Sequence, residues 1–535
     1  MRFGHMKHFI KSPFSLGVIL AALLGAIGIS PASDETTPPA PSSPPPCYDR
    51  SKFPEPIFDQ EPGYVDLYWK SCDLAAAHVL NQPGLPSSPY MDEAFADQYI
   101  WIWDSCFMAL FCRYSQGVLP GIESLSNFYA AIHDGSSLTA NYRGDSKYHV
   151  LIRHSDNPPL FAWVEWQHFQ MTGDKDRIRW LLKEKQYLQK HYQWFRSLKH
   201  GELFPFTDVP IILKPQPLGF EWGGVASGMD NSPRFGAPGL LAIDAISQQG
   251  LSAKYIALLA KAIGDTALQS EYETEYKRIC DLVNEHYWDE EDGFYYDLLP
   301  DGHFSKVRTP ASFWPVLAGM ATPQKVDRMA QRLKDSDDLG GSVPWVSLSR
   351  SDKAFDSQTG NYWRGAVWLP TAYMGIRALT ENGQGDLADK TAEQLLRHMY
   401  LTYRDYSPHT LWEAYNPIQP IPAYYGTKIV KPDFCGWSAL GPISLFIENV
   451  IGIHSVNASE RVVEWRLHQP GRHGVRNFRF ADVATDLVAD GQGHVDVTSN
   501  SNYILIINGK RFKVEAGTRR FAVPSVPSSE QPSKE

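Results

Sequence analysis

Three short segments of the chain combine aromatic and acidic residues with residues that favour tight turns. They are YIWIWDSCF at 99–107, EWGGVASGMDNSPRF at 221–235 and TLWEAYNP at 410–417. An aromatic ring offers a flat apolar face and a neighbouring carboxylate accepts hydrogen bonds, which together suit a pocket that holds hydroxyl groups. Asp104 and Asp230 also belong to the type that caps helices, whereas Glu413 does not. These residues favour a polar-ligand site, with capping as the alternative for the two aspartates.

Two carboxyl groups on either side of a glycosidic bond are sufficient to hydrolyse it. One carboxyl with a raised pKa protonates the leaving oxygen, and the other activates water or attacks directly. The pattern alone does not select a pair from the 60 Asp and Glu residues. The histidines show no HExxH-like spacing and the six cysteines include no CxxC pair. The sequence therefore predicts neither a metal site nor a cofactor.

The composition is typical of a soluble globular protein with a large core. Of the 535 residues, 43% are hydrophobic and 21% are charged, and the formal net charge is -10. A protein that binds nucleic-acid phosphates usually carries a basic patch, and no long basic run is present. We expect no nucleic-acid partner, and the 16 Trp and 26 Tyr rings fit either core packing or stacking on a sugar. The oligomeric state is not predicted.

The first 32 residues are predicted to be a signal peptide. Arg2, Lys7 and Lys11 form a basic segment, an apolar stretch covers residues 16–29, and small residues follow at 30–32. The stretch is short for a membrane span, although a retained anchor is the alternative. The mature chain is expected to have no integral membrane domain and to be periplasmic or secreted. Residues 33–53 are predicted to be a Pro/Ser-rich linker.

Repeated helical hairpins are predicted over residues 54–455. One apolar helical segment ends and another begins at each of three Gly-Asp pairs, at 173–174, 264–265 and 385–386. At each pair, Gly suits the left-handed C-cap of the first helix and Asp suits the N-cap of the next. A closed ring of helix pairs fits this pattern, and a solenoid is disfavoured because no fixed period appears. Alternating residues predict a small β domain at 456–524, followed by a disordered tail at 525–535.

Four motifs in a fixed order resemble the catalytic domain of glycoside hydrolase family 63 and its relatives, which include bacterial α-glucosidases, mannosylglycerate hydrolases and, more distantly, trehalases. The motifs are SGMDNSPRF (227–235), GNYWRGAVWLP (360–370), LWEAYNP (411–417) and FCGWSALGP (434–442). The resemblance extends from Tyr99 to Ile453. It implies a mainly α fold with an (α/α)6 barrel, and hydrolysis with inversion at the anomeric carbon.

The resemblance also assigns roles to individual residues. It implies that Asp230 is the general acid and Glu413 the general base, with carboxyl groups about 6.5–9.5 Å apart. It implies that Trp103 and Asp104 bind the sugar in the -1 subsite. The resemblance implies that four further residues complete the wall of this subsite, with barrel core as the alternative for the rings: Tyr362, Trp363, Arg364 and Trp368.

Two details of the implied site depend on single residues. Arg364 is a candidate ion-pair partner of a catalytic carboxylate. Asn157 stands where relatives often carry Gln before two prolines, so its reach to the sugar is one methylene shorter. This departure leaves the identity of the substrate open.

The sequence and the resemblance together predict an inverting glycoside hydrolase that cleaves α-glucosyl or α-mannosyl bonds in an oligosaccharide or a small glycoside. One alternative is a sugar isomerase, epimerase or lyase, because helical toroids also carry those activities. Such enzymes usually transfer protons with His or Tyr, whereas both expected carboxylates are present here. The other alternative is an inactive sugar-binding protein, against which the intact Asp230 and Glu413 also argue.

Overall fold

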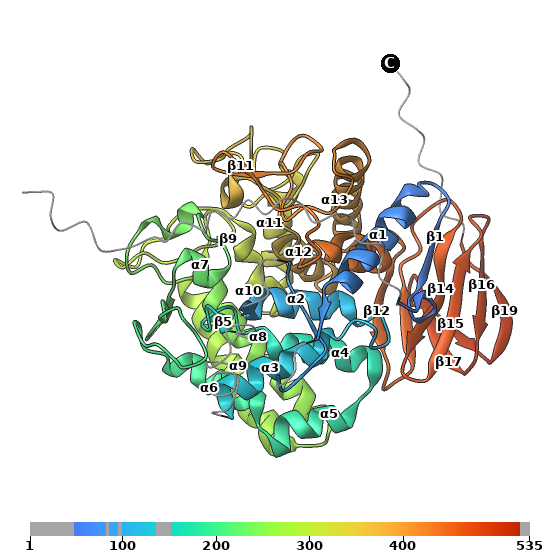
Figure 1. Cartoon of the computed structure of the whole chain (residues 1–535), viewed down its shortest axis with the longest axis horizontal. Coiled ribbons are helices and arrows are strands. Elements are labelled where there is room, and N and C mark those ends of the chain that lie inside the picture. The colour runs from blue at the N-terminus through green and yellow to red at the C-terminus, as the bar shows by residue number, and fades with distance from the viewer. Residues whose placement is uncertain (1–47, 82–84, 95–98, 135–150, 525–535) are drawn as a thin grey trace, which may run out of the picture. The chain divides into compact units, whose positions relative to one another are not determined.

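Helices form most of the regular secondary structure of the described chain, and the strands of two larger β-sheets lie mainly toward its C-terminal end (Figure 1). The computed structural model describes residues 48–81, 85–94, 99–134 and 151–524. The predicted signal peptide, residues 33–47 of the predicted linker and the predicted tail at 525–535 lie outside these residues. No described helix is both long and apolar enough to cross a membrane.

In this part of the chain, six helical elements pack side by side around a common interior. In order, α2 packs on α4, α4 on α8, α8 on α10, α10 on α12, α12 on η8, and η8 returns to α2. Most of their residues are buried, as expected for elements surrounded on all sides. Their bounds are α2 Ile102–Cys112, α4 Phe161–Thr172, α8 Ile243–Ala262, α10 Trp314–Leu317, α12 Leu369–Glu381 and η8 Gly441–Val450.

Seven further helices of the described chain, from five to 21 residues long, lie outside these six and bury mainly one side. In α11 the buried residues are Val326, Met329, Ala330 and Leu333, which follow the spacing of one helix face. The outer helices are α1 Gly63–Ala77, α3 Gly121–His133, α5 Lys175–Arg179, α6 Tyr187–Ser197, α9 Thr266–His286, α11 Pro323–Lys334 and α13 Gly385–Asp405. The helical part predicted from the sequence is therefore present as paired inner and outer helices.

Two of the three predicted Gly-Asp junctions have the expected geometry. Asp174 accepts hydrogen bonds from the first turn of α5 and Asp265 from that of α9, each directly after a left-handed glycine. The prediction is wrong at 385–386, because α13 already begins at Gly385 and Asp386 lies inside its first turn. The left-handed glycine between α12 and α13 is Gly383.

The C-terminal region contains two β-sheets. One sheet has the order β1-β14-β15-β16-β19 and the other β12-β13-β17-β18. In Figure 1 the strands β14, β15 and β16 run side by side, as their antiparallel registers require. The bounds are β12 Ile453–Asn457, β13 Val462–Trp465, β14 His473–Phe480, β15 Val483–Ala489, β16 His494–Ser499, β17 Tyr503–Ile507, β18 Lys510–Val514 and β19 Gly517–Ala522.

The boundary between the helical and β regions differs from the prediction. The strand β1 (Glu55–Phe58) pairs antiparallel with β14, so residues assigned to the helical domain extend the C-terminal sheet. In addition, β12 begins at Ile453 and packs against α4 and η8. A short strand carries no signal of its partner when that partner lies more than 400 residues away in the sequence.

Short elements connect the long helices and carry much of the candidate site. The short strands are β2 Val79–Leu80, β3 Tyr90–Met91, β4 Tyr99–Trp101, β5 Leu151–Arg153, β6 Lys214–Gln216, β7 Gly219–Glu221, β8 Trp288–Asp289, β9 Phe294–Tyr295, β10 Tyr424–Tyr425 and β11 Lys428–Ile429. The short helices are η1 Arg50–Lys52, η3 Trp180–Glu184, α7 Gly224–Ser227, η4 Pro233–Gly236, η5 Pro310–Phe313, η6 Tyr362–Arg364 and η7 Ser438–Leu440.

Candidate active site

The predicted site residues gather near the N-terminal ends of the inner helices. Trp103 and Asp104 lie in the first turn of α2, and Trp368 is the N-cap residue of α12. The unpaired N–H groups of a helix N-terminus carry partial positive charge, which favours nearby carboxylates. This arrangement suits a site built from acidic side chains.

The loop that carries Asp230 is folded so tightly that two positions require glycine. A Cβ atom at Gly224 would lie 2.1 Å from the backbone oxygen of Asp230. Gly228 has a φ of +81°, and a Cβ there would approach the Trp103 ring to 3.1 Å. The Asp230 loop therefore lies directly against Trp103, which brings together the first two of the aromatic-acidic segments.

A buried arginine fixes the loop on its other side. The Arg234 guanidinium is 1% exposed and binds the Asp297 carboxylate with Nε and Nη2 at 2.9 and 2.7 Å. It also binds both oxygens of Asp244 at 2.8 and 2.9 Å. Sequence reasoning missed this cluster, because its partners lie 10 and 63 residues away and no local pattern links them.

Asn231, the neighbour of Asp230, connects the loop to residues 361–364. Its side chain donates to the Asn361 carbonyl at 3.1 Å and accepts from the Trp363 backbone N–H at 2.8 Å. Tyr362 follows with a φ of 63°, a left-handed conformation that is costly for a bulky residue. The Asn231 contacts hold this segment in the strained conformation, which aims the Tyr362 ring at Glu413.

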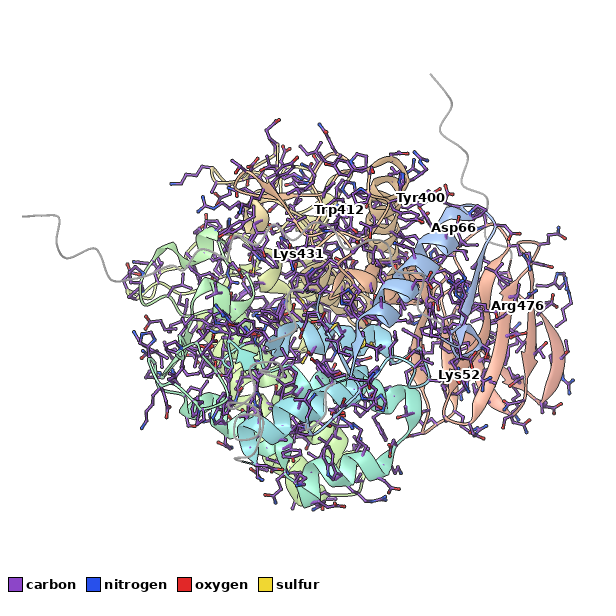
Figure 2. All side chains as sticks on the ribbon, viewed as in Figure 1. Lys52, Asp66, Tyr400, Trp412, Lys431 and Arg476 are labelled. Atoms are coloured by element: carbon purple, nitrogen blue, oxygen red, sulfur yellow. The ribbon has the colours of Figure 1, made fainter. Side chains whose placement is uncertain are left out.

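Glu413 is buried and accepts two hydrogen bonds from other residues. The Tyr362 hydroxyl donates to Oε1 at 2.7 Å, and the Lys431 backbone N–H donates to Oε2 at 3.1 Å. Its backbone carbonyl accepts from the Trp437 indole at 2.8 Å. Trp412 and Lys431, both labelled in Figure 2, belong to the two extended segments that meet here, since Glu413 N–H also donates to Lys431 O.

Aromatic rings form a continuous wall beside Glu413. Trp363 stacks on Trp368 with centroids 4.2 Å apart and planes 7° apart. Tyr362 meets Trp368 edge-on at 4.6 Å, and Trp437 packs against Trp368 at 5.6 Å. Trp363 and Trp368 are almost completely buried, so they support the wall while the half-buried Tyr362 faces the site.

The two predicted catalytic carboxyl groups have different surroundings. Solvent reaches Asp230, yet protein surrounds its carboxyl group closely, and this burial, with the negative charge of Glu413, raises its pKa to about 7. Burial also raises the pKa of Glu413, but the bonds from Tyr362 and Lys431 oppose that effect. Among the described residues, no other residue donates a hydrogen bond to the Asp230 carboxyl group. Asp230 is therefore the group that holds a proton more readily at neutral pH.

Asp104 and Glu93 add two more buried carboxyl groups. The pKa of Asp104 is raised well above its usual value by burial and by the charges of Glu413 and Asp230. Its Oδ1 atom has no hydrogen-bond partner in the described chain. Glu93 binds Trp101 N–H and Ser105 Oγ through Oε1 at 3.0 and 3.1 Å, and burial raises its pKa well above the usual value. Sequence reasoning missed Glu93, which lies outside the four motifs and before the stretch of resemblance at 99–453.

Two predicted site residues make contacts different from those expected. The Arg364 Nε donates to the Asn231 carbonyl at 3.2 Å, and Arg364 forms no ion pair within the described residues. The expectation that it pairs with a catalytic carboxylate is therefore wrong. Asn157 is buried and donates through Nδ2 to the Ala226 carbonyl at 2.9 Å, so it supports the short helix α7. Its contact with a sugar stays a prediction.

A cavity of about 440 Å³ opens beside Asp230. Its walls include the rings of Trp222 and Phe235, the Arg364 side chain and the glycine-rich loop at 223–239. This volume lies in the range of small-molecule pockets. Within the described ranges, no cluster of three or more His, Cys, Asp or Glu residues is arranged to hold a metal ion. The buried carboxyl groups of the site are suited to proton transfer.

Two curated relatives are similar to this chain over different lengths. An uncharacterized protein of Borreliella burgdorferi is 29% identical over 82% of this chain and 90% of its own length. The mannosyl-oligosaccharide glucosidase of Saccharomyces cerevisiae is 25% identical over 50% of this chain. The match spans only 34% of the length of that glucosidase.

A solved structure and a family model complete the comparison. The GH63 mannosylglycerate hydrolase of Thermus thermophilus, in complex with Tris and D-glycerate, has a TM-score of 0.51 at 18% identity. The comparison covers 71% of this chain and 99% of that one, which shows a common fold. The model of the mannosylglycerate hydrolase MGH1-like glycoside hydrolase domain matches residues 97–420, which include all of the candidate site except residues 93 and 431–437. The chain belongs to this family of glycoside hydrolases.

Proposed function

We propose that the protein is an inverting glycoside hydrolase with Asp230 as general acid and Glu413 as general base. The observation that carries this proposal is the unequal hydrogen bonding of the two carboxyl groups. Glu413 accepts from Tyr362 and Lys431, which favours its ionised form, whereas Asp230 has no such donor in the described chain and has a pKa of about 7. A protonated acid and an ionised base are the states that acid-base hydrolysis requires.

The scaffold of the proposed enzyme is an (α/α)6 barrel. The inner elements contact one another in sequence and return to the first, and outer helices cover them. The likeness of fold to a GH63 enzyme supports the same architecture. In such a barrel, the N-terminal ends of the inner helices and the loops before them form the site.

The proposed reaction proceeds in one step. Asp230 gives its proton to the glycosidic oxygen while the bond from that oxygen to the anomeric carbon breaks. Glu413 removes a proton from a water molecule, whose oxygen attacks the anomeric carbon from the opposite face. The products are the free aglycone and a sugar of inverted anomeric configuration. Asp230 is left ionised and Glu413 protonated, and exchange with solvent restores both.

The neighbouring residues have supporting roles in this proposal. Asp104, whose Oδ1 lacks a partner in the described part of the chain, accepts hydrogen bonds from sugar hydroxyl groups. Trp103 and Tyr362 provide ring faces, and Trp363 and Trp368 hold Tyr362 in place. Tyr362 also keeps the Glu413 carboxylate oriented toward the attacking water.

The proposed substrates carry α-linked glucosyl or mannosyl groups. The names of the relatives include mannosylglycerate and mannosyl-oligosaccharide, which support this class. We also propose that residues 1–32 direct export to the periplasm or the medium. N-terminal sequencing of protein from the native host tests this localisation: a mature chain that starts near residue 33 supports export, and an intact N-terminus in the cytoplasm contradicts it.

The activity is tested with a panel of α-linked gluco- and manno-disaccharides and mannosylglycerate. Hydrolysis of at least one member by the wild-type protein, with loss of turnover in Asp230→Asn and Glu413→Gln, is the expected result. Substrate binding without hydrolysis by the wild type would contradict the proposal and favour a binding protein. Conversion to an isomer without release of two products would favour an isomerase.

A further inference from the structure

The first turn of α2 is bound by an acidic residue from an earlier segment of the chain. Trp101 is the N-cap residue of α2, and its indole ring has a hydrogen-bond donor but no acceptor. The Glu93 carboxyl group supplies the acceptor through Oε1, which binds Trp101 N–H at 3.0 Å and the Ser105 hydroxyl at 3.1 Å. Glu93 therefore caps the helix that carries Trp103 and Asp104.

The bond that Glu93 makes is usually made by a residue of the helix itself. In a capping box, an acidic side chain three positions after the N-cap reaches back to the N–H of the N-cap residue. In α2 that position belongs to Asp104, because the N-cap is Trp101. Trp101 N–H donates to Glu93 instead, and Asp104 Oδ1 has no partner in the described chain. Glu93 thus occupies the donor that would otherwise hold Asp104.

Asp104 is consequently left to act in the site. Its side chain is buried, and its pKa is raised by that burial and by the negative charges of Glu413 and Asp230. Those charges reach Asp104 strongly because the three carboxyl groups lie near one another away from bulk water. An Asp104 that capped its own helix would have one oxygen engaged by the backbone and fewer acceptor sites for a sugar.

The segment that carries Glu93 is fixed by its neighbours. Met91 N–H donates to Ser124 Oγ at 2.9 Å, which connects β3 to α3. A Cβ atom at Gly436 would lie 3.1 Å from the Glu93 backbone oxygen, so the motif at 434–442 packs directly against this residue. The Glu93 side chain is 0% exposed. A carboxyl group held in this way keeps the end of α2 in one position.

We propose that Glu93 is a positioning residue of the active site, which caps α2 in place of Asp104 and so leaves the Asp104 carboxyl group free to bind the sugar. This inference rests on the proposed role of Asp104 in binding sugar hydroxyl groups. The alternative is a cap that only stabilises α2. The two roles differ in what the removal of Glu93 does to Asp104.

The first test is a double-mutant cycle of Glu93 and Asp104 on a panel substrate that the wild type hydrolyses. Glu93→Met keeps the buried volume but offers no oxygen to Trp101, so Asp104 should turn back to this N–H. We expect kcat/KM to fall about 10–100-fold, the effect of losing one hydrogen bond to a charged group. In the Asp104→Ala background, the same substitution should lower kcat/KM by less than about threefold, because the carboxyl group through which it acts is gone. Equal losses in the two backgrounds would overturn the proposal.

Two variants separate positioning from folding. Glu93→Gln has almost the shape of Glu93→Met but keeps an acceptor oxygen, so it should retain kcat/KM within about threefold of the wild type. Asp265→Ala removes the N-cap bond of the outer helix α9 and should lower stability with kcat/KM unchanged. A loss in Glu93→Gln as large as in Glu93→Met, or an equal loss in Asp265→Ala, would contradict a role through the capping bond.

The second test does not depend on hydrolysis. A crystal structure of Glu93→Met should show the Asp104 carboxyl group within hydrogen-bond distance of Trp101 N–H, and one of Glu93→Gln should show Asp104 as in the wild type. If the methionine variant does not fold, Glu93→Ala takes its place, since water can fill the space. An Asp104 side chain that keeps its wild-type rotamer without the Glu93 acceptor would overturn the positioning role. A wild type that hydrolyses no panel member would instead contradict the proposed function, so the two proposals fail separately.

Discussion

Buried carboxyl groups lie at both ends of the inner helices, and their surroundings differ. At the C-terminal ends, Glu448 accepts hydrogen bonds from two arginines and two tyrosines. At the N-terminal ends, Asp104 and Glu93 each keep an oxygen without a partner in the described chain, and Asp230 has a raised pKa. Removal of a compensated carboxylate leaves its buried partners unpaired and lowers stability, whereas an uncompensated buried carboxylate is itself a cost in stability.

The largest expected effects come from the two catalytic carboxyl groups. With a substrate of poor leaving group, Asp230→Asn and Glu413→Gln should each lower kcat by about 10²–10⁴-fold, the usual contribution of a general acid or base. With an aryl glycoside whose leaving group needs no proton, Asp230→Asn should recover most of its activity and Glu413→Gln should not. Steady-state kinetics on both substrates measures this difference. If Glu413→Gln recovers its activity on the aryl glycoside and Asp230→Asn does not, Glu413 is the general acid and Asp230 the general base.

The comparison between the two ends predicts opposite effects on stability. Glu448→Gln leaves Arg113 and Arg377 without their shared carboxylate and should lower the free energy of unfolding by about 3–5 kcal/mol. Glu413→Gln removes a buried charge that is only partly compensated and should leave stability equal or higher. Denaturant unfolding of both variants tests this contrast. Equal destabilisation by the two substitutions would show that the carboxyl groups at the two ends of the inner helices contribute equally to stability.

Arg234 is expected to act on the position of Asp230 rather than on the chemistry. Arg234→Lys cannot keep the paired bonds to Asp244 and Asp297 and should cost about 2 kcal/mol of stability. If the loop also moves, kcat should fall and the alkaline limb of the pH profile, which reports Asp230, should shift. A stable variant with an unchanged profile would contradict the positioning role. Arg404→Gln removes an exposed ion pair of α13 and serves as the control.

The smallest predicted effect concerns the hydrogen bond from Tyr362 to Glu413. This bond favours the ionised base, so Tyr362→Phe should raise the pKa of Glu413. Activity requires ionised Glu413, and the acidic limb of kcat/KM should therefore move to higher pH, with a loss of about tenfold near that limb. The alkaline limb, which the wild type should show near pH 7 from Asp230, should change less. An unchanged acidic limb would exclude this role for Tyr362.

Four ordered motifs predict the candidate site residues through their resemblance to a known family. The residue pattern alone does not select Asp230 and Glu413 among the 60 acidic residues, and the roles that the resemblance gives them stay predictions. The helical hairpins were also predictable, because amphipathic spacing and Gly-Asp junctions are local signals. The junction at 385–386 was misplaced because Gly383 offers the same local signal two residues earlier.

The parts that escaped prediction depend on contacts between distant segments. Arg234 reaches Asp297 across 63 residues, β1 pairs with β14 across the whole helical region, and Glu93 meets Ser105 only after β4 and α2 are placed. The wrong prediction that Arg364 pairs with a catalytic carboxylate has the same origin, because the Arg364 Nε donates to the Asn231 carbonyl of a distant segment. Partner choice in these cases is set by three-dimensional packing, which spacing along one sequence does not encode.

Proton NMR of the anomers released in the first minutes of hydrolysis is the sharpest test of inversion by Asp230 and Glu413. The assay uses an α-linked substrate from the panel at a temperature where mutarotation is slow relative to turnover. The proposed mechanism predicts that the β-anomer appears first and that the α-anomer follows only by mutarotation, because water attacks opposite the leaving group. Initial release of the α-anomer would mean retention, and would contradict Glu413 as a base acting on water.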